Sequence, residues 1–162
     1  MTASSESGAS PAGDAPTENE GTFSVTVTLE RGYRFDVDSG MPGAEHFHVD
    51  EGPPLGEGSG PSPSRVLAAA MASCLASSLI FCLSKSRIQL RGLRVTARGT
   101  MVRNERKRLR VGGLHVELFP EVAAADETRM QRCLEIFEDF CVVTESIRAG
   151  IPVVVGVETH TS

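Results

Sequence analysis

Nineteen consecutive residues without a charged side chain, 66–84, limit what this chain can fold into more than any other feature. Ser62 and Pro63 precede them and form a typical helix start, with a hydroxyl N-cap followed by a proline in the first turn. A stretch of this length is compatible with a membrane span. However, eight of the residues between 68 and 78 are Ala or Ser, which transfer weakly into lipid and favour close helix packing. We therefore expect a central buried helix and no membrane span.

The composition indicates one soluble globular domain. The chain has 162 residues, of which 40% are hydrophobic and 23% are charged, and its mean hydropathy is -0.08. Residues 1–21 are mostly Ser, Ala, Gly, Pro and acidic residues, with no large apolar side chain after Met1. We expect a disordered acidic N-terminal tail over 1–21 and a single domain over 22–162.

The charge is concentrated in that tail and gives no reason to expect an ionic partner. Glu6, Asp14, Glu18 and Glu20 supply four of the five net negative charges, so the remaining chain is almost neutral. Trp is absent and Tyr occurs once, which disfavours the stacking that nucleic-acid binding uses. The first residues lack the basic start and apolar run of a secretory signal, so we expect a cytoplasmic protein with reduced cysteines.

Alternating apolar and polar residues predict several antiparallel strands. Three short strands are expected within 22–32, 33–40 and 46–52, followed by a Gly- and Pro-rich loop that leads to the uncharged helix. Two longer strand-like stretches, 88–102 and 108–122, are separated by a basic run and predict a hairpin.

The last third of the chain predicts helices and a closing strand. A second helix is expected to begin at Asp126 and to carry both Cys133 and Cys141, since apolar residues recur there at helical spacing. Residues 144–149 indicate further helical turns that end at Gly150, and the β-branched residues of 151–158 predict a final strand. This order of elements is typical of the α+β class.

Four cysteines lie in the two predicted main helices: Cys74, Cys82, Cys133 and Cys141. In each helix the two cysteines are eight residues apart, which corresponds to a rise of about 12 Å. Neither pair can form its own disulfide or share one tetrahedral metal ion at that separation. A disulfide would have to join the two helices. The alternative is that all four are small core residues.

Two segments of the chain resemble one known family. GPSPSRVLAAAMASCLASSLIFCLSK (60–85) and CVVTESIRAGIPVVVGVE (141–158) resemble the OsmC/Ohr family, which comprises osmotically inducible protein C and the organic hydroperoxide resistance proteins. The resemblance extends over about 22–158. It implies an OsmC-like α+β fold, with antiparallel sheets around long central helices in an intertwined homodimer. A nearly uncharged helix, which a chain of this size cannot cover completely, agrees with a dimer.

The resemblance also implies a thiol-dependent peroxidase. By motif position, Cys74 would attack organic hydroperoxides or hydrogen peroxide and become a sulfenate, and Cys141 would then form a disulfide with it. No bound cofactor is implied, because an external small thiol or lipoyl-type dithiol reduces the disulfide in this family. The alternative is a non-catalytic binding or structural protein with the OsmC fold.

A thiolate at neutral pH needs a cation or hydrogen-bond donors, because a free thiol has a pKa of ~8.5. The resemblance implies an arginine from the loop between the first two strands, and we expect Arg31 in this role, with Arg34 as the alternative. Active family members hold this arginine with a Glu directly after the helix-starting proline, where this chain has Ser64. Glu57 or Glu51 in the preceding loop could replace that carboxylate. The departure predicts lower activity or its loss.

Three other features have an ordinary structural interpretation. Cys82 and Cys133 match no catalytic position and are expected to be core residues. His46 and His48 lie on one side of a strand, but no further metal ligands are evident, so we expect surface histidines and no metal site. The basic run 103–110 lacks aromatic residues and is expected to be a solvated hairpin tip without nucleic-acid binding.

Overall fold

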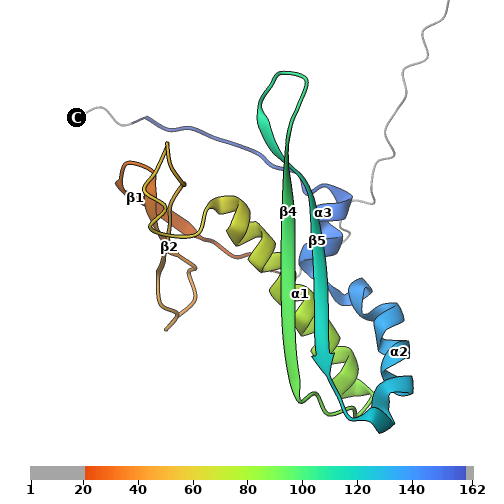
Figure 1. Cartoon of the computed structure of the whole chain (residues 1–162). Coiled ribbons are helices and arrows are strands. Elements are labelled where there is room, and N and C mark those ends of the chain that lie inside the picture. The colour runs from red at the N-terminus through yellow and green to blue at the C-terminus, as the bar shows by residue number, and fades with distance from the viewer. Residues whose placement is uncertain (1–20, 160–162) are drawn as a thin grey trace, which may run out of the picture.

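The computed structural model describes residues 21–159 and has a mixed α+β architecture, as the sequence predicted (Figure 1). The predicted disordered tail lies outside the described residues, apart from Gly21. The strands and main helices follow the predicted order up to the last element. They are β1 (Thr26–Arg31), β2 (Arg34–Asp38), β3 (Phe47–Val49), α1 (Pro63–Lys85), β4 (Gly92–Arg103), β5 (Leu109–Glu121), α2 (Glu127–Ile136) and α3 (Val142–Ala149).

The first three strands form an antiparallel sheet in the order β1-β2-β3, next to the N-terminal end of α1 (Figure 1). A tight turn joins β1 to β2, and Gly32 allows it by taking a positive φ of 53°. Val37 of β2 is buried, whereas Val27, its partner on β1, is 56% exposed. The sheet therefore leaves much of its apolar surface uncovered in the single chain.

The loop between β3 and α1 is organised by one buried carboxylate. Oδ2 of Asp50 accepts hydrogen bonds from the backbone N–H of Ser59 at 3.0 Å, from the Ser59 hydroxyl at 2.9 Å and from the backbone N–H of Glu57 at 3.2 Å. The Ser59 N–H contributes most to lowering the pKa of Asp50, against the effect of burial. Gly56 approaches the backbone of Glu51 so closely that a β-carbon would lie 2.2 Å from its carbonyl oxygen. The loop is thereby held in one conformation, and Glu57 is fixed near the β1–β2 turn.

Helix α1 buries one face and leaves the opposite face exposed. Leu75, Leu79 and Leu83 lie in the core with Ile88, while Phe81 is 48% exposed. The helix is central, as expected, and the single chain covers only one of its sides, as its near lack of charge predicted, because β4, α2 and α3 pack there. The helix is long and apolar enough to cross a membrane, and 33% of its most apolar window is buried in the single chain. Core helices of soluble proteins meet the same criterion of length and composition.

Strands β4 and β5 form a long antiparallel hairpin that lies across α1 (Figure 1). Its tip is the predicted basic turn, in which Nη1 of Arg103 donates to the carbonyl of Lys107 at 2.8 Å and Oδ1 of Asn104 accepts from the N–H of Arg108 at 3.0 Å. The side chains of the tip are exposed. The prediction of a hairpin with a solvated basic tip is confirmed.

The prediction of one helix carrying both Cys133 and Cys141 is wrong. Helix α2 ends at Ile136 and is followed by a 3₁₀ turn over Phe137–Phe140. The backbone N–H of Cys141 bonds to the carbonyl of Glu138, three residues back, at 2.8 Å. Because this tighter turn still directs Phe137 and Cys141 to the core, the apolar spacing could not distinguish it from a continuous helix. Cys141 becomes the N-cap of a separate helix, α3, which ends at Gly150 as predicted.

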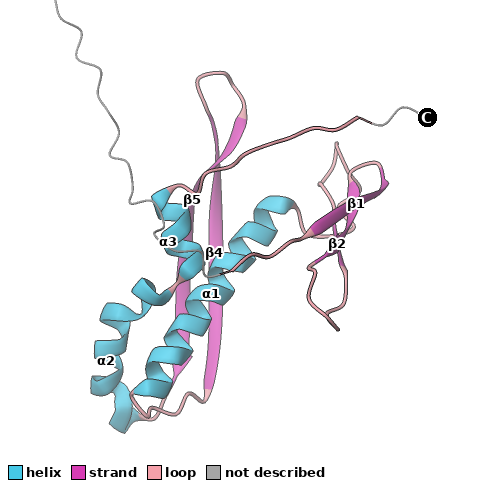
Figure 2. Ribbon diagram, turned by 180° about the vertical axis from the view of Figure 1, so that it is seen from behind, coloured by secondary structure: helices cyan, strands magenta, loops and turns pink. Residues whose placement is uncertain are grey.

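The predicted closing strand over 151–158 is also wrong for the single chain. Residues 151–158 form no strand pairing and leave α3 as an extended trace (Figure 2). Val153, Val154 and Val155 are 82%, 95% and 80% exposed. Their β-branched side chains favour extended backbone, but a strand also needs a neighbouring strand for its hydrogen bonds, and none of the strands within residues 21–159 pairs with them.

Candidate active site

The fold brings Cys74 of α1 and Cys141 of α3 together. Cys74 is half-buried, and Cys141 is fully buried in the core. The Cys74 thiol donates a hydrogen bond to the Cys141 sulfur. Both are free thiols in the structure. Two interacting thiols can share one proton or, after oxidation, form a disulfide.

The N-terminus of α3 stabilises negative charge on Cys141. Burial acts to raise the pKa of Cys141, but hydrogen bonding with the Thr144 hydroxyl and backbone N–H, with Cys74 and with Ser78 outweighs burial and lowers the pKa. The sulfur and Oγ1 of Thr144 are 3.0 Å apart. Exposed backbone N–H groups at a helix start are a common means of lowering a cysteine pKa.

The pKa of Cys74 is raised, in contrast to that of Cys141. Burial is the largest effect and raises the pKa of Cys74, and the neighbouring Cys141 adds to the rise, whereas the backbone N–H groups of Val143 and Val142 act to lower it. The first negative charge of the pair therefore resides on Cys141, and the proton on Cys74. Since Cys141 is fully buried, Cys74 is the sulfur that a solute can reach.

A small cavity of about 210 Å³ is lined by Thr144, which contacts Cys141, and by Met71, Leu75, Arg148 and Glu138, among others, while neither cysteine of the pair lines it. Arg148 forms ion pairs with Glu138 at 2.6 Å and with Glu145 at 2.5 Å, which raise the pKa of the guanidinium. The sequence analysis missed Thr144 and Ser78 as partners of the pair. A cysteine directly before a short helix, with a hydroxyl three residues later, was the available signal.

Arg31 and Arg34 lie on the N-terminal sheet, away from the cysteines. Arg31 forms an ion pair with Glu57 at 3.1 Å, as the sequence suggested for Glu57, and Arg34 bonds to Glu30 at 2.6 Å and to Ser59 at 2.9 Å. Within residues 21–159, neither arginine has a described contact with a cysteine sulfur. The single chain thus holds the predicted arginine in place, but does not bring it to the sulfur pair.

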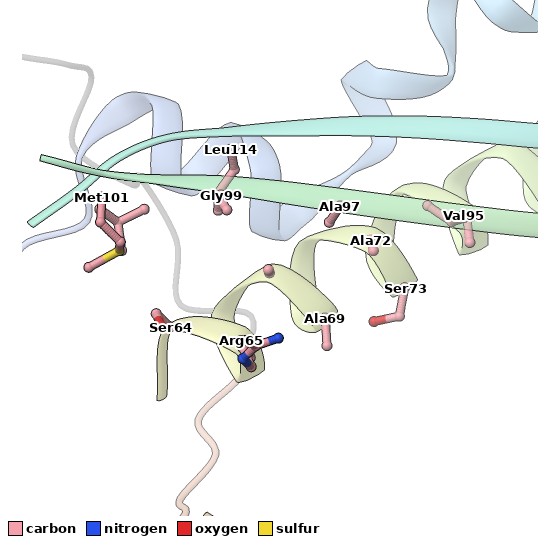
Figure 3. Close-up of a pocket in the computed structure, with 13 residues that line it drawn as sticks. Ser64, Arg65, Ala69, Ala72, Ser73, Val95, Ala97, Gly99, Met101 and Leu114 are labelled. Carbon is pink, nitrogen blue, oxygen red and sulfur yellow. The ribbon is translucent and has the colours of Figure 1, made fainter. Parts of the chain in front are cut away.

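Ser64 stands at the start of α1, where its hydroxyl lies 3.1 Å from that of Ser62. It also lines a groove of about 640 Å³ between α1 and β4. Figure 3 shows that Ala72 of α1 lies on the side of the helix toward Ala97 of β4, and Ala69 also lines this groove. Neither Cys74 nor Cys141 lines the groove, and it shares only Leu114 with the cavity at Thr144.

His48 of β3 and His46, the residue directly before β3, both contact carboxylates. Nδ1 of His46 lies 2.8 Å from Asp36, and Nδ1 of His48 lies 3.3 Å from Glu30. The hydrogen bond with Asp36 contributes most to raising the pKa of His46. Among the described residues, no group of three or more potential ligands could hold a metal ion.

Comparisons with known proteins agree with the fold described above. The sequence matches the family model described as OsmC-like protein over residues 56–156. No curated protein matches it at a significant level.

Solved structures of similar fold include an OsmC-like protein of unknown function from Vibrio cholerae, with 14% identity, 78% of this chain and 93% of that chain covered, and a TM-score of 0.67. An organic hydroperoxide resistance protein from Elizabethkingia anophelis has 23% identity, covers 83% and 93% of the two chains and gives a TM-score of 0.61. The organic hydroperoxide resistance protein OhrB of Bacillus subtilis has 18% identity, covers 80% and 92% and gives 0.55. By its sequence match and its fold, this chain belongs to the OsmC-like protein family.

Proposed function

We propose that the protein is a thiol-dependent peroxidase that reduces organic hydroperoxides or hydrogen peroxide at Cys74 and Cys141. The observation that supports it best is that Cys74 packs against the core cluster that contains Cys141 and that the two thiols interact at the N-terminus of α3. Three similar structures are described as organic hydroperoxide resistance proteins, which agrees with a peroxide-related redox function.

In the proposed reaction, Cys74 attacks because it is the more exposed sulfur. Its proton passes to Cys141 or to the leaving oxygen, and the Cys74 thiolate displaces an alcohol from the O–O bond, becoming a sulfenic acid. The Cys141 thiolate then attacks the sulfenic sulfur and releases water, which leaves a Cys74–Cys141 disulfide. In total, the two thiols lose two electrons and two protons, and the peroxide becomes an alcohol and water.

The proposed active form is an intertwined homodimer. In the single chain, Ile80 and Phe81 of α1 and Val154 after α3 are 47%, 48% and 95% exposed, and uncovered apolar surface of this kind marks interfaces. A second copy would cover these faces. In such a dimer, Arg31 of the partner subunit would approach Cys74 and stabilise its thiolate. Light scattering tests the dimer, and only monomer at micromolar concentration would contradict it.

The proposed reaction uses no bound cofactor. A small thiol or a lipoyl-type dithiol from outside the protein would reduce the disulfide, and the setting would be the reducing cytoplasm. Mixed-disulfide exchange begins at the more accessible sulfur, which is Cys74.

Peroxide consumption with a dithiol reductant tests the proposal. In the background Cys82→Ala/Cys133→Ala, the added change Cys74→Ser should abolish consumption, and Cys141→Ser should allow at most one turnover per chain. The matched variant Cys82→Ala/Cys133→Ala, which keeps the proposed active pair, should retain activity. Wild-type consumption no faster than that of Cys74→Ser would reject a peroxidase.

A second candidate is a non-catalytic binding or structural protein. The raised pKa of Cys74 in the single chain and Ser64 in place of the family's Glu favour it. Alkylation of Cys74 at the rate of a free thiol, in a protein shown to be dimeric, would support this candidate over the peroxidase.

A further inference from the structure

A second pair of cysteines lies two helical turns from the first. Cys82 of α1 and Cys133 of α2 are 6% and 1% exposed, and both belong to the core cluster that includes Cys141. The Cys82 thiol donates a hydrogen bond to the Cys133 sulfur. The eight-residue spacing in α1 is matched by eight residues between Cys133 and Cys141, since the segment from α2 to α3 runs back along α1.

The surroundings of this second pair position both sulfurs. The hydroxyl of Ser86, one turn after Cys82, lies 3.3 Å from Sγ of Cys133, and the Ser86 N–H donates to the carbonyl of Cys82 at 3.0 Å. The guanidinium of Arg129, on the same helix as Cys133, donates to the carbonyl of Ser86. The end of α1 is therefore tied to α2 by two polar contacts at Ser86, next to the sulfurs.

We propose that Cys82 and Cys133 form a second dithiol site, which a hydroperoxide oxidises to an intrachain disulfide between α1 and α2. Cys133 displaces an alcohol from the O–O bond and becomes a sulfenic acid. Cys82 then attacks that sulfur, and water leaves. Two thiols are oxidised and one peroxide is reduced, so the whole chain can take up four electron equivalents instead of two.

This second site is slower than the pair of Cys74 and Cys141. Burial is the main cause that raises the pKa of Cys82 to about 11. At pH 7 its thiolate fraction is then about one in ten thousand, whereas Sγ of Cys133 has the Ser86 hydroxyl 3.3 Å away as a hydrogen-bond partner, so we assign the first attack to Cys133 and the second to Cys82. Since both sulfurs are also less exposed than Cys74, we expect oxidation at least about tenfold slower than at the first pair.

A tryptic digest of the wild type cannot show which cysteines are linked, so the test uses variants that keep only one of the two cysteine pairs. Tryptic peptide 66–85 contains Cys74 and Cys82, and peptide 133–148 contains Cys133 and Cys141. The variant Cys74→Ser/Cys141→Ser leaves only the second pair, and Cys82→Ala/Cys133→Ala leaves only the first. Each is treated with excess cumene hydroperoxide, its free thiols are titrated after denaturation, and its non-reduced digest is analysed by mass spectrometry.

In Cys74→Ser/Cys141→Ser we expect the titrated thiols to fall from two to zero, with peptides 66–85 and 133–148 linked and a raised Tm. Two thiols that remain free, or a loss of thiols without the link, would overturn the proposal. Chymotryptic digestion of the oxidised wild type checks the result if that variant does not fold, since cleavage after Phe81 and Phe140 separates the cysteines. This outcome does not depend on the first pair, so each proposal can fail alone.

Discussion

The Cys74 thiol of α1 donates a hydrogen bond to the sulfur of Cys141, and the first turn of α3 directs backbone N–H groups at both sulfurs. The arrangement stabilises a single negative charge shared by the pair. Burial alone would raise the pKa of both thiols, so the hydrogen bonds at the helix start are what keep one of them available as a thiolate.

Thr144→Val is expected to raise the pKa of Cys141, because it removes the hydroxyl 3.0 Å from the sulfur while keeping the side-chain volume. Disulfide formation after peroxide treatment should slow by roughly three- to tenfold at pH 7, and its pH profile should shift upward. Stopped-flow oxidation across a pH series measures both. Thr144→Ser, which retains a hydroxyl, should behave like the wild type, and equal profiles for Thr144→Val and Thr144→Ser would contradict the role given to the hydroxyl.

Arg31→Ala is expected to lower peroxidase kcat/KM by roughly tenfold or more, since it removes the proposed charge beside Cys74. Its effect on Tm should be small, because Arg31 and Glu57 are exposed and such ion pairs contribute little stability. The comparison is with Arg34→Ala, which loses contacts to Glu30 and Ser59 and should affect Tm more than kcat/KM. The reverse pattern would make Arg34 the activating residue.

Gly56→Ala is expected to destabilise the loop before α1 by about 1–3 kcal/mol, because the new β-carbon would meet the Glu51 carbonyl and the Asp50 carboxylate. Displacement of the loop would also separate Glu57 from Arg31 and reduce activity. Gly52→Ala is the control, as no atom lies within 4 Å of the added carbon there. Denaturant unfolding and kcat/KM measured on both variants check the prediction, and equal stability would show that the loop relaxes freely.

His46 is expected to make the stability of the N-terminal sheet depend on pH. Its pKa is raised above 6.5, chiefly by Asp36 at 2.8 Å, so its stabilising contribution is complete below pH 6.5 and is lost as the pH rises through the raised value. The Tm difference between the wild type and His46→Gln should therefore be largest at acidic pH and disappear at alkaline pH. A difference independent of pH would exclude titration of His46 as its cause.

Local patterns predicted most of the fold. Strands β1 to β3, helix α1, the β4–β5 hairpin and its basic tip follow from alternation, capping residues and an uncharged run, all of which act within a few residues. The break between α2 and α3 did not follow, because a 3₁₀ turn preserves the inward positions of Phe137 and Cys141. The strand expected over 151–158 does not form for another reason. A strand needs hydrogen bonds to a neighbouring strand, and no strand among the described residues pairs with this segment.

The site was predictable only in part. Helical rise excluded a disulfide within either cysteine pair, but only the family resemblance linked Cys74 to Cys141. The contribution of the α3 N-terminus could not be seen while Cys141 was placed inside a longer helix. Of the two carboxylates that the sequence offered for Arg31, Glu57 and Glu51, the structure pairs Arg31 with Glu57, but the separation of Arg31 from the sulfurs in the single chain is a tertiary property that local spacing does not encode.

The most direct test of the account is to map the disulfide formed in Cys82→Ala/Cys133→Ala after treatment with one equivalent of cumene hydroperoxide. In this variant each of the tryptic peptides 66–85 and 133–148 contains a single cysteine. The account predicts that the two peptides become linked through Cys74 and Cys141 as the peroxide is consumed, and that adding Cys74→Ser abolishes both effects. Two thiols that stay free in the presence of unconsumed peroxide would contradict it.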